Sequence, residues 1–241
     1  MNVLAIGNSF SQDATRYLHR IARADGVGLN VTNLYIGGCP LEQHFRNMHA
    51  DERAYMLEYN GEQTRFAVSL KEALLNRSWD VVTLQQASPV SFEKETYFPY
   101  LTILTDYVKE LCPKAKILLH QTWGYETGSA KAERTPFSCY EQMQEAVIKA
   151  YAEAAEEIDC AGIIPCGELL KKLTENGVEK IHRDGYHLQK GIGRYATALL
   201  WYRMLTGKTV AENTFCDWDE AVEEKDMLLA KRLVDEFSPI F

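Results

Sequence analysis

A serine near the start of the chain and an Asp-His pair near its end carry the residue types that acyl transfer needs. Ser9 lies in the run GNSFS, and Asp184 and His187 lie in the run DGYHL. A serine hydroxyl needs a base to take its proton, and an imidazole needs a carboxylate that fixes its tautomer and stabilises its charged form. Each motif supplies what the other lacks, so together they indicate a serine hydrolase.

Each motif also has a purely structural explanation. Ser9 and Gln12 have the spacing of a capping box, in which the hydroxyl caps the helix and the glutamine reaches back. Asp184 could open the last helix in the same way. A single histidine near a helix start is more often a surface or core residue than a catalyst.

Short apolar segments that alternate with longer amphipathic ones predict the elements that must position these motifs. Such alternation indicates βαβ units, and hence a parallel sheet of about five strands in a three-layer α/β/α sandwich. Ligands bind such sheets at the carboxyl ends of the strands, and Ser9 follows the first strand directly, at a helix N-terminus that favours negative charge. The predicted strands are 3–6, 29–35, 81–84, 117–120 and 162–165, and the predicted helices are about 12–24, 97–112, 137–158 and 190–205, with further helical segments up to about 76.

Length and composition predict one domain that spans all 241 residues, 46% of them hydrophobic. The segment from about 42 to 63 is the least periodic, and we interpret it as an insertion or lid. The net charge of -8 comes with scattered Lys and Arg, which argues against a nucleic-acid partner. No run is apolar enough to span a membrane, and the start of the sequence lacks an export signal, so we expect a cytoplasmic protein unless a leader was trimmed. The six thinly spread cysteines fit reduced thiols, and no feature indicates the oligomeric state.

The two motifs resemble the first and last sequence blocks of the SGNH (GDSL-like) hydrolases. GNS around Ser9 is similar to their Gly-Asp-Ser block, and Asp184 to Leu188 is similar to their DxxHL block. The resemblance covers nearly the whole chain, is greatest for the DUF4886-type branch, and implies a flavodoxin-like fold. It also implies that Ser9 is the nucleophile, His187 the general base and then acid, and Asp184 its orienting partner, with no cofactor.

The middle blocks of the family are less well matched. A glycine after the second strand would supply a backbone N–H to an oxyanion, and Gly38 occupies that place, although a plain turn would explain it as well. The family's Gly-x-Asn-Asp block is replaced by LQQAS, so one oxyanion donor is missing. Gln86 could supply an equivalent side-chain N–H beside the N–H groups of Ser9 and Gly38, and Gln85 is its rival.

A polar and aromatic run, HQTWGY, follows the fourth predicted strand. Trp123 and Tyr125 could form a flat platform for a sugar ring, with Gln121 bonding to hydroxyls, but a buried aromatic cluster is the commoner arrangement.

The function that we predict is hydrolysis of a small acyl ester, with a carbohydrate as the expected alcohol. Two alternatives stay open at this point. One is a carbohydrate-binding protein on the same scaffold, which the altered third block favours. The other is a metal-dependent hydrolase that uses His182, Asp184 and His187, although no usual metal-ligand spacing is present.

Overall fold

A seven-stranded sheet forms the centre of the computed structural model, which describes residues 1–241. The strand order is β4-β3-β2-β1-β5-β6-β7, and the run from β2 to β7 is parallel throughout. These five parallel strands are the predicted ones, so the sequence-based expectation is confirmed for them. The strands are β1 Asn2–Gly7, β2 Asn30–Tyr35, β3 Tyr55–Tyr59, β4 Glu62–Val68, β5 Val81–Leu84, β6 Lys116–His120 and β7 Gly162–Ile164.

The segment from 42 to 63, interpreted above as an insertion or lid, holds most of a helix and most of a hairpin that extends the sheet. After α3 (Leu41–Ala50), the chain forms the antiparallel hairpin of β3 and β4 and adds it to β2. The turn is Asn60-Gly61, and both residues have positive φ, of 53° and 84°. An Asn-Gly pair between strands is a strong hairpin signal. The alternation of apolar residues is weak here because most of β4 is exposed, which is why periodicity did not indicate a strand.

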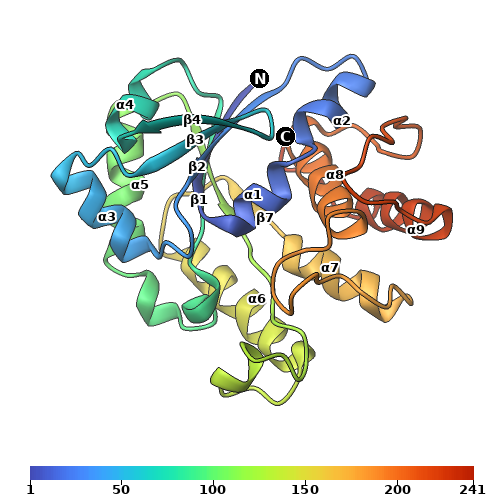
Figure 1. The fold of residues 1–241 in the computed structure, drawn as a ribbon. Helices are drawn as coiled ribbons and strands as arrows, with labels where there is room; N and C mark the ends of the chain where they lie inside the picture. Colours follow the sequence, from blue (N-terminus) through green and yellow to red (C-terminus); the bar gives the residue numbers. More distant parts are fainter.

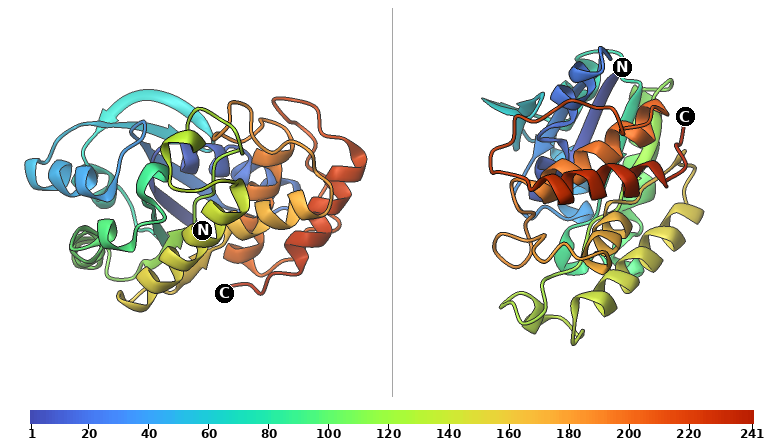
Figure 2. Two further views of the ribbon diagram at one scale, coloured as in Figure 1. Left: turned by 90° about the horizontal axis from the view of Figure 1, so that it is seen from below. Right: turned by 90° about the vertical axis from the view of Figure 1, so that its right-hand side faces the viewer.

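Helices cover both faces of the sheet in two layers (Figures 1 and 2). One layer holds α3, α4, α5 and α6, and the other holds α1, α2, α7, α8 and α9, with α8 packed against its four neighbours. The predicted helix over 12–24 is two helices in the structure, and α7 and α9 were not predicted. The helices other than α3 are α1 Ser9–Thr15, α2 Leu18–Ala24, α4 Leu70–Leu75, α5 Tyr100–Leu111, α6 Tyr140–Glu156, α7 Cys166–Glu175, α8 Ile192–Thr206 and α9 Glu224–Asp235.

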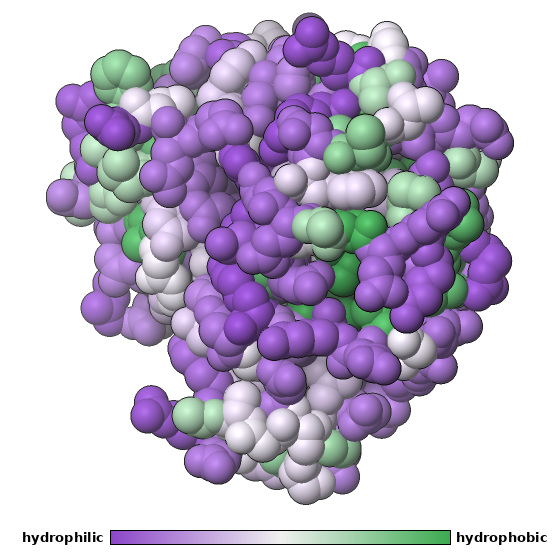
Figure 3. Space-filling model, turned by 45° about the vertical axis from the view of Figure 1, so that its right-hand side comes forward, coloured by the Kyte–Doolittle hydropathy of each residue, from purple (hydrophilic) through white to green (hydrophobic).

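The core and the surface of the molecule are clearly separated. A single apolar core of 61 buried residues holds both layers to the sheet, so the ends of the strands are rigidly placed. Polar side chains cover most of the surface that Figure 3 shows. None of the helices is long and apolar enough to cross a membrane. All six cysteines are unpaired.

Candidate active site

Ser9 lies at the point in the sheet where the strand order reverses. β1 pairs with β2 on one side and β5 on the other, and the chain leaves β1 through Gly7 into α1. In open parallel sheets this reversal point is where ligands bind. A Cβ on Gly7 would come within 2.6 Å of the Gln85 Oε1 atom, so only glycine fits this close approach.

The helix is capped by Asn8 and not by Ser9. The Asn8 Oδ1 atom accepts a hydrogen bond from the Phe10 N–H at 3.0 Å, and Gln12 bonds to Glu58 instead of reaching back to the cap. Ser9 is therefore the first helical residue, and its hydroxyl is not used as a cap. The capping-box alternative for Ser9 is wrong because the residue before it does that work.

Asp184, His187 and Ser9 form a continuous hydrogen-bonded series. The His187 Nε2 atom lies 2.9 Å from the Ser9 Oγ atom, and the His187 Nδ1 atom lies 2.7 Å from the Asp184 Oδ2 atom. The other Asp184 oxygen accepts the backbone N–H of His187 at 2.9 Å. With Nδ1–H donating to the carboxylate, Nε2 is free to accept the Ser9 proton.

The local environment keeps Asp184 ionised. Burial opposes the charged form, but hydrogen bonds from the ring and backbone of His187 outweigh it and lower the pKa of Asp184 below its ordinary value. Gly185, with a φ of 89°, allows the tight turn that brings both side chains to one side. Asp184 does not open a helix, since α8 begins only at Ile192.

A buried carboxylate that the sequence analysis missed joins the His187 loop to the helix of Ser9. Asp13, one turn after Ser9 on α1, is fully buried and accepts the Leu188 N–H at 3.0 Å. It also pairs with Arg183 at 3.0 Å and with Arg194 at 2.8 Å. Asp13 therefore holds the loop on both sides of His187. Its place four residues after Ser9 was the available signal, because i and i+4 share one helix face.

Gly38 presents a free backbone N–H at the same edge of the sheet. It has a φ of 64°, a conformation that favours glycine, and a Cβ there would meet no atom within 4 Å. Its N–H has no hydrogen-bond acceptor in the protein. The first N–H of a helix has no helical acceptor either. The backbone amides of Gly38 and Ser9 therefore have no hydrogen-bond acceptor within the protein.

Neither glutamine of the altered third block is free to donate in the way we expected. The Gln86 amide nitrogen donates to the carbonyl and hydroxyl of Thr96 at 2.9 and 3.1 Å, and its oxygen accepts the Leu41 N–H. Gln86 therefore joins two loops. The oxyanion role predicted for Gln86 is wrong, because its amide nitrogen already donates to Thr96. The Gln85 amide nitrogen donates to Asn8 Oδ1 at 2.8 Å. Both side chains are buried.

The residues predicted to bind a sugar belong to the core. Trp123 is fully buried, stacks on Phe10 with ring centroids 4.2 Å apart, and donates to the carbonyl of Tyr186 at 2.8 Å. Tyr125 and Gln121 are also buried, with Tyr125 bonded to Ser88 and Gln121 to Glu168. Neither aromatic ring has a face open to a sugar. The predicted sugar platform is therefore wrong, and the structure has the buried aromatic cluster that was its alternative. Trp123 instead supports the peptide next to His187.

The ligand set of the metal-dependent alternative is not assembled. The ring of His182 is buried and bonds to the carbonyl of Gly124 through Nε2 at 3.1 Å, away from Asp184 and His187. No group of three or more His, Cys, Asp or Glu side chains is arranged to hold a metal ion. Both ring nitrogens of His187 already have hydrogen-bond partners, Nε2 with Ser9 and Nδ1 with Asp184.

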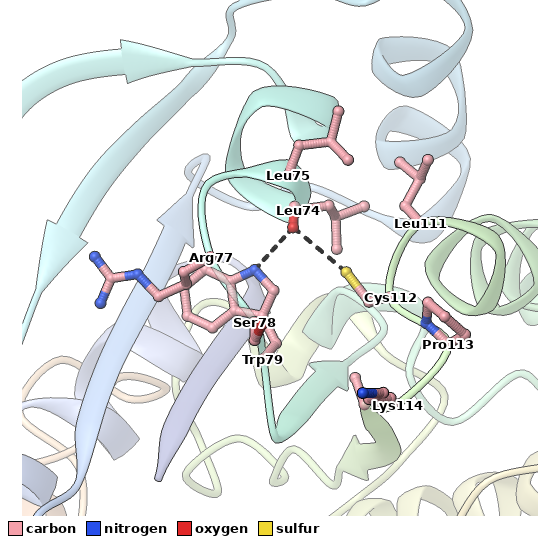
Figure 4. Close-up of a pocket in the computed structure, with 10 residues that line it drawn as sticks. Leu74, Leu75, Arg77, Ser78, Trp79, Leu111, Cys112, Pro113 and Lys114 are labelled. Carbon is pink, nitrogen blue, oxygen red and sulfur yellow. Dashed lines mark hydrogen bonds between the residues drawn. The ribbon is translucent and has the colours of Figure 1, made fainter.

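Two cavities of about 470 Å³ lie at opposite ends of the sheet. One is beside Gly38, with Phe98, Tyr100, Glu42 and Glu95 in its wall. The other, at the amino ends of β5 and β6, is lined mostly by apolar residues, and Trp79 and Cys112 donate there to the Leu74 carbonyl (Figure 4). Of these two cavities, only the first contains a candidate site residue, so it is the one that adjoins the candidate site.

Comparisons with known proteins agree with this architecture. The family model described as "Domain of unknown function (DUF4886)" matches residues 2–236. A crystal structure of a DUF4886 family protein from Bacteroides uniformis is 32% identical, with a TM-score of 0.91 over 98% of this chain and 93% of the other.

More distant structures share the fold. A protein from Slackia heliotrinireducens assigned to the SGNH hydrolases is 21% identical, with a TM-score of 0.62 over 85% of this chain and 98% of the other. A carbohydrate esterase of family 3 from Talaromyces cellulolyticus is 12% identical, with a TM-score of 0.57 over 86% and 97%. The sequence has no significant match among the curated proteins. The resemblance to the SGNH fold and its DUF4886 branch is confirmed.

Proposed function

This chain belongs to the DUF4886 family, and on that premise we propose that it is a serine-dependent hydrolase of small acyl esters. The observation that carries the proposal is the series from Ser9 through His187 to Asp184, with contacts of 2.9 and 2.7 Å. Nucleophile, base and orienting carboxylate lie within hydrogen-bond reach of one another, as this chemistry requires. The shared fold alone would not support it, because one fold hosts many functions.

The reaction proceeds in two steps. The His187 Nε2 atom takes the Ser9 proton as Oγ attacks the ester carbonyl carbon, and the N–H groups of Ser9 and Gly38 stabilise the oxyanion. The intermediate collapses as His187 protonates the leaving alcohol, which leaves an acyl group on Ser9. Water, deprotonated by His187, then attacks the acyl-enzyme. As the second tetrahedral intermediate collapses, the bond between the acyl carbon and the Ser9 Oγ atom breaks, His187 returns the proton to Oγ, and the acid is released. Asp184 stabilises the imidazolium in both steps.

The cavity beside Gly38 supports a small acyl group and a larger alcohol. Its volume of about 470 Å³ falls within the usual range of ligand sites and far exceeds what an acetyl group would fill. Its wall combines the rings of Phe98 and Tyr100 with the carboxylates of Glu42 and Glu95, and no Lys or Arg lines it. Aromatic faces and carboxylate acceptors suit a hydroxyl-rich alcohol such as a sugar. Carbohydrate specificity therefore rests on this cavity and not on Trp123.

Covalent labelling and hydrolysis test the proposal together. We expect a fluorophosphonate to label the protein and p-nitrophenyl acetate to be hydrolysed, and Ser9→Ala to abolish both. Ser78→Ala changes an exposed serine at the opposite end of the sheet and should leave both unchanged. If Ser9→Ala folds and keeps the wild-type rate, the proposal is contradicted. If no acetyl ester is hydrolysed while sugars still bind in the cavity, the non-catalytic alternative is favoured instead.

A further inference from the structure

Three buried side chains from neighbouring strand ends form a hydrogen-bonded series beneath the candidate site. His120 Nδ1 lies 2.8 Å from Gln85 Oε1, Gln85 Nε2 lies 2.8 Å from Asn8 Oδ1, and Asn8 Nδ2 lies 3.2 Å from the carbonyl of Cys39. Each of the four residues is at most 2% exposed. The series therefore crosses from β6 through β5 and β1 to the loop that carries Gly38.

Two backbone groups at the Asn8 end determine the direction of every bond. The Phe10 N–H can only donate, so the Asn8 atom that faces it is the oxygen, and the Asn8 amide nitrogen must face the Cys39 carbonyl. The bond to Asn8 Oδ1 must then come from the Gln85 amide nitrogen. This leaves the Gln85 oxygen toward His120, whose Nδ1 must carry the proton. No other assignment satisfies all four residues.

The ring of His120 can hold this arrangement over a wide pH range. Burial lowers the pKa of His120 to about 3, so the ring stays neutral wherever ester hydrolysis is measured. Its Nε2 atom has no hydrogen-bond partner in the protein, which agrees with a neutral ring protonated on Nδ1.

We infer that Asn8, Gln85 and His120 are positioning residues that set the Gly38 N–H against Ser9. The inference rests on the proposed function. Asn8 joins the two sides directly, because it precedes Ser9 and holds the carbonyl of Cys39, the residue after Gly38. Gly38 itself is exposed and a Cβ there would meet open space, so its orientation depends on how the flanking loop is held. The Asn8 bond acts there beside the backbone bond from the Cys39 N–H to the Ile36 carbonyl, at 3.3 Å.

The same series explains why the first and third sequence blocks depart from the SGNH pattern together. An aspartate at position 8 would have no donor for the Cys39 carbonyl and would place a negative oxygen against it. Asparagine supplies that donor, and its oxygen then has room for a second donor, which Gln85 provides. Gln85 thus acts through Asn8 and does not contact the oxyanion itself.

The oxyanion contact is tested by an oxygen-to-sulfur change in the substrate. We compare p-nitrophenyl acetate with its thionoester, because sulfur accepts hydrogen bonds weakly and gains little from a well-placed N–H. In Asn8→Asp and Gln85→Met, we expect kcat for the oxygen ester to fall about 10- to 100-fold with little change in KM. The ratio of kcat for the oxygen ester to kcat for the thionoester, which measures the preference for oxygen, should fall in the same variants.

Two matched variants separate positioning from loss of stability. Gln144→Met removes another buried glutamine, one that accepts the Gly124 N–H at 2.8 Å outside the series, and it should keep the wild-type preference. His120→Asn places a donor near the former Nδ1 position and should keep most of the rate, whereas His120→Leu should behave like Gln85→Met. An unchanged oxygen preference in Gln85→Met, or an equal loss in Gln144→Met, would overturn the inference.

An NMR measurement makes the inference independent of activity. The Gly38 amide resonance should shift in Gln85→Met and not in Gln144→Met, and the His120 ring should be protonated on Nδ1. If Ser9→Ala retains hydrolysis, the proposed function fails, yet the Gly38 shift still reports whether the series orients that amide. If the Gly38 resonance does not move, the positioning role is wrong whatever the enzyme activity is.

Discussion

The Nε2 atom of His187 lies 2.9 Å from the Oγ atom of Ser9, although 178 residues separate them in the chain. Asp13 stabilises this contact. It lies in α1, the helix that begins at Ser9, and it bonds to Arg183 and to the Leu188 N–H, on either side of His187. The proposed nucleophile and its base are therefore both held by the first turns of α1. The predictions that follow depend on this arrangement.

Removing the charge of Asp184 should slow the reaction without unfolding the protein. In Asp184→Asn, the amide can donate to His187 Nδ1, which favours the tautomer with the proton on Nε2 and takes away the base for Ser9. We expect kcat for p-nitrophenyl acetate to fall about 10³-fold or more near neutral pH, with the thermal unfolding midpoint within a few degrees of wild type. A rate within a factor of two of wild type would show that His187 needs no carboxylate.

Asp13→Asn should lower the stability of the folded protein. The fully buried Asp13 carboxylate pairs with two guanidinium groups, those of Arg183 and Arg194, whose side chains are 25% and 12% exposed. Arg194 keeps Asp219 as a second partner at 2.8 Å, but the half-buried Arg183 loses its main carboxylate. We therefore expect the free energy of unfolding to fall by about 3 kcal/mol in urea titrations. Asp217→Asn is the matched control, because that side chain is 81% exposed and should change stability by about 0–1 kcal/mol. Equal effects of the two variants would count against the anchoring role.

Glu95 should make the cavity selective for the charge of the alcohol. Its carboxylate lines the cavity and forms no ion pair or hydrogen bond in the structure, whereas Glu42 is paired with Arg46. At low salt we expect kcat/KM for an acetate ester of a negatively charged alcohol to be about 5- to 10-fold below that of an uncharged isostere.

Charge-neutral variants decide whether Glu95 causes that preference. Glu95→Gln should reduce the preference for the uncharged ester over the negatively charged one, and high salt should reduce it too. Glu93→Gln removes the same charge two residues away, outside the cavity wall, and should leave the preference intact. A preference that survives in Glu95→Gln would assign it to the overall negative charge of the protein.

Stability should decline in mild acid because three histidines are buried in the neutral form. Burial lowers the pKa of His120 to about 3 and the pKa values of His44 and His182 to about 4. The unfolded chain binds protons on these rings below about pH 6.5, while the folded protein does not until its lower pKa values are reached. The neutral rings thus contribute stability that is present above about pH 6.5 and is lost as the pH falls toward about 4.

Urea titrations between about pH 7 and about pH 5 measure this loss, which should approach about 1.4 kcal/mol per pH unit for each buried histidine. His120→Asn removes one such ring and should reduce the slope by about a third. His49→Gln changes an exposed histidine and should leave the slope as it is. An unchanged slope in His120→Asn would mean that the ring already takes up its proton in the folded state.

The sequence by itself determined the five parallel strands of the sheet and indicated the two ends of the candidate site. Strand 81–84 was predicted with the bounds that the structure has, because a fully buried parallel strand is a short apolar run that contrasts with its flanks. The motifs of Ser9 and His187 could be paired because each residue type needs the other, and parallel topology brings strand ends to one edge.

Only the tertiary structure decided what the polar and aromatic side chains at that edge do. Periodicity tells which face of a strand a residue occupies, but beyond the last strand residue the direction of a side chain depends on loops from elsewhere in the chain. Gln86 meets Thr96, Trp123 is covered by Phe10, and Asn8 reaches the Cys39 carbonyl. Each of these partners is distant or lies in an irregular segment, so the hydrogen bonds that commit these side chains exist only in the folded chain.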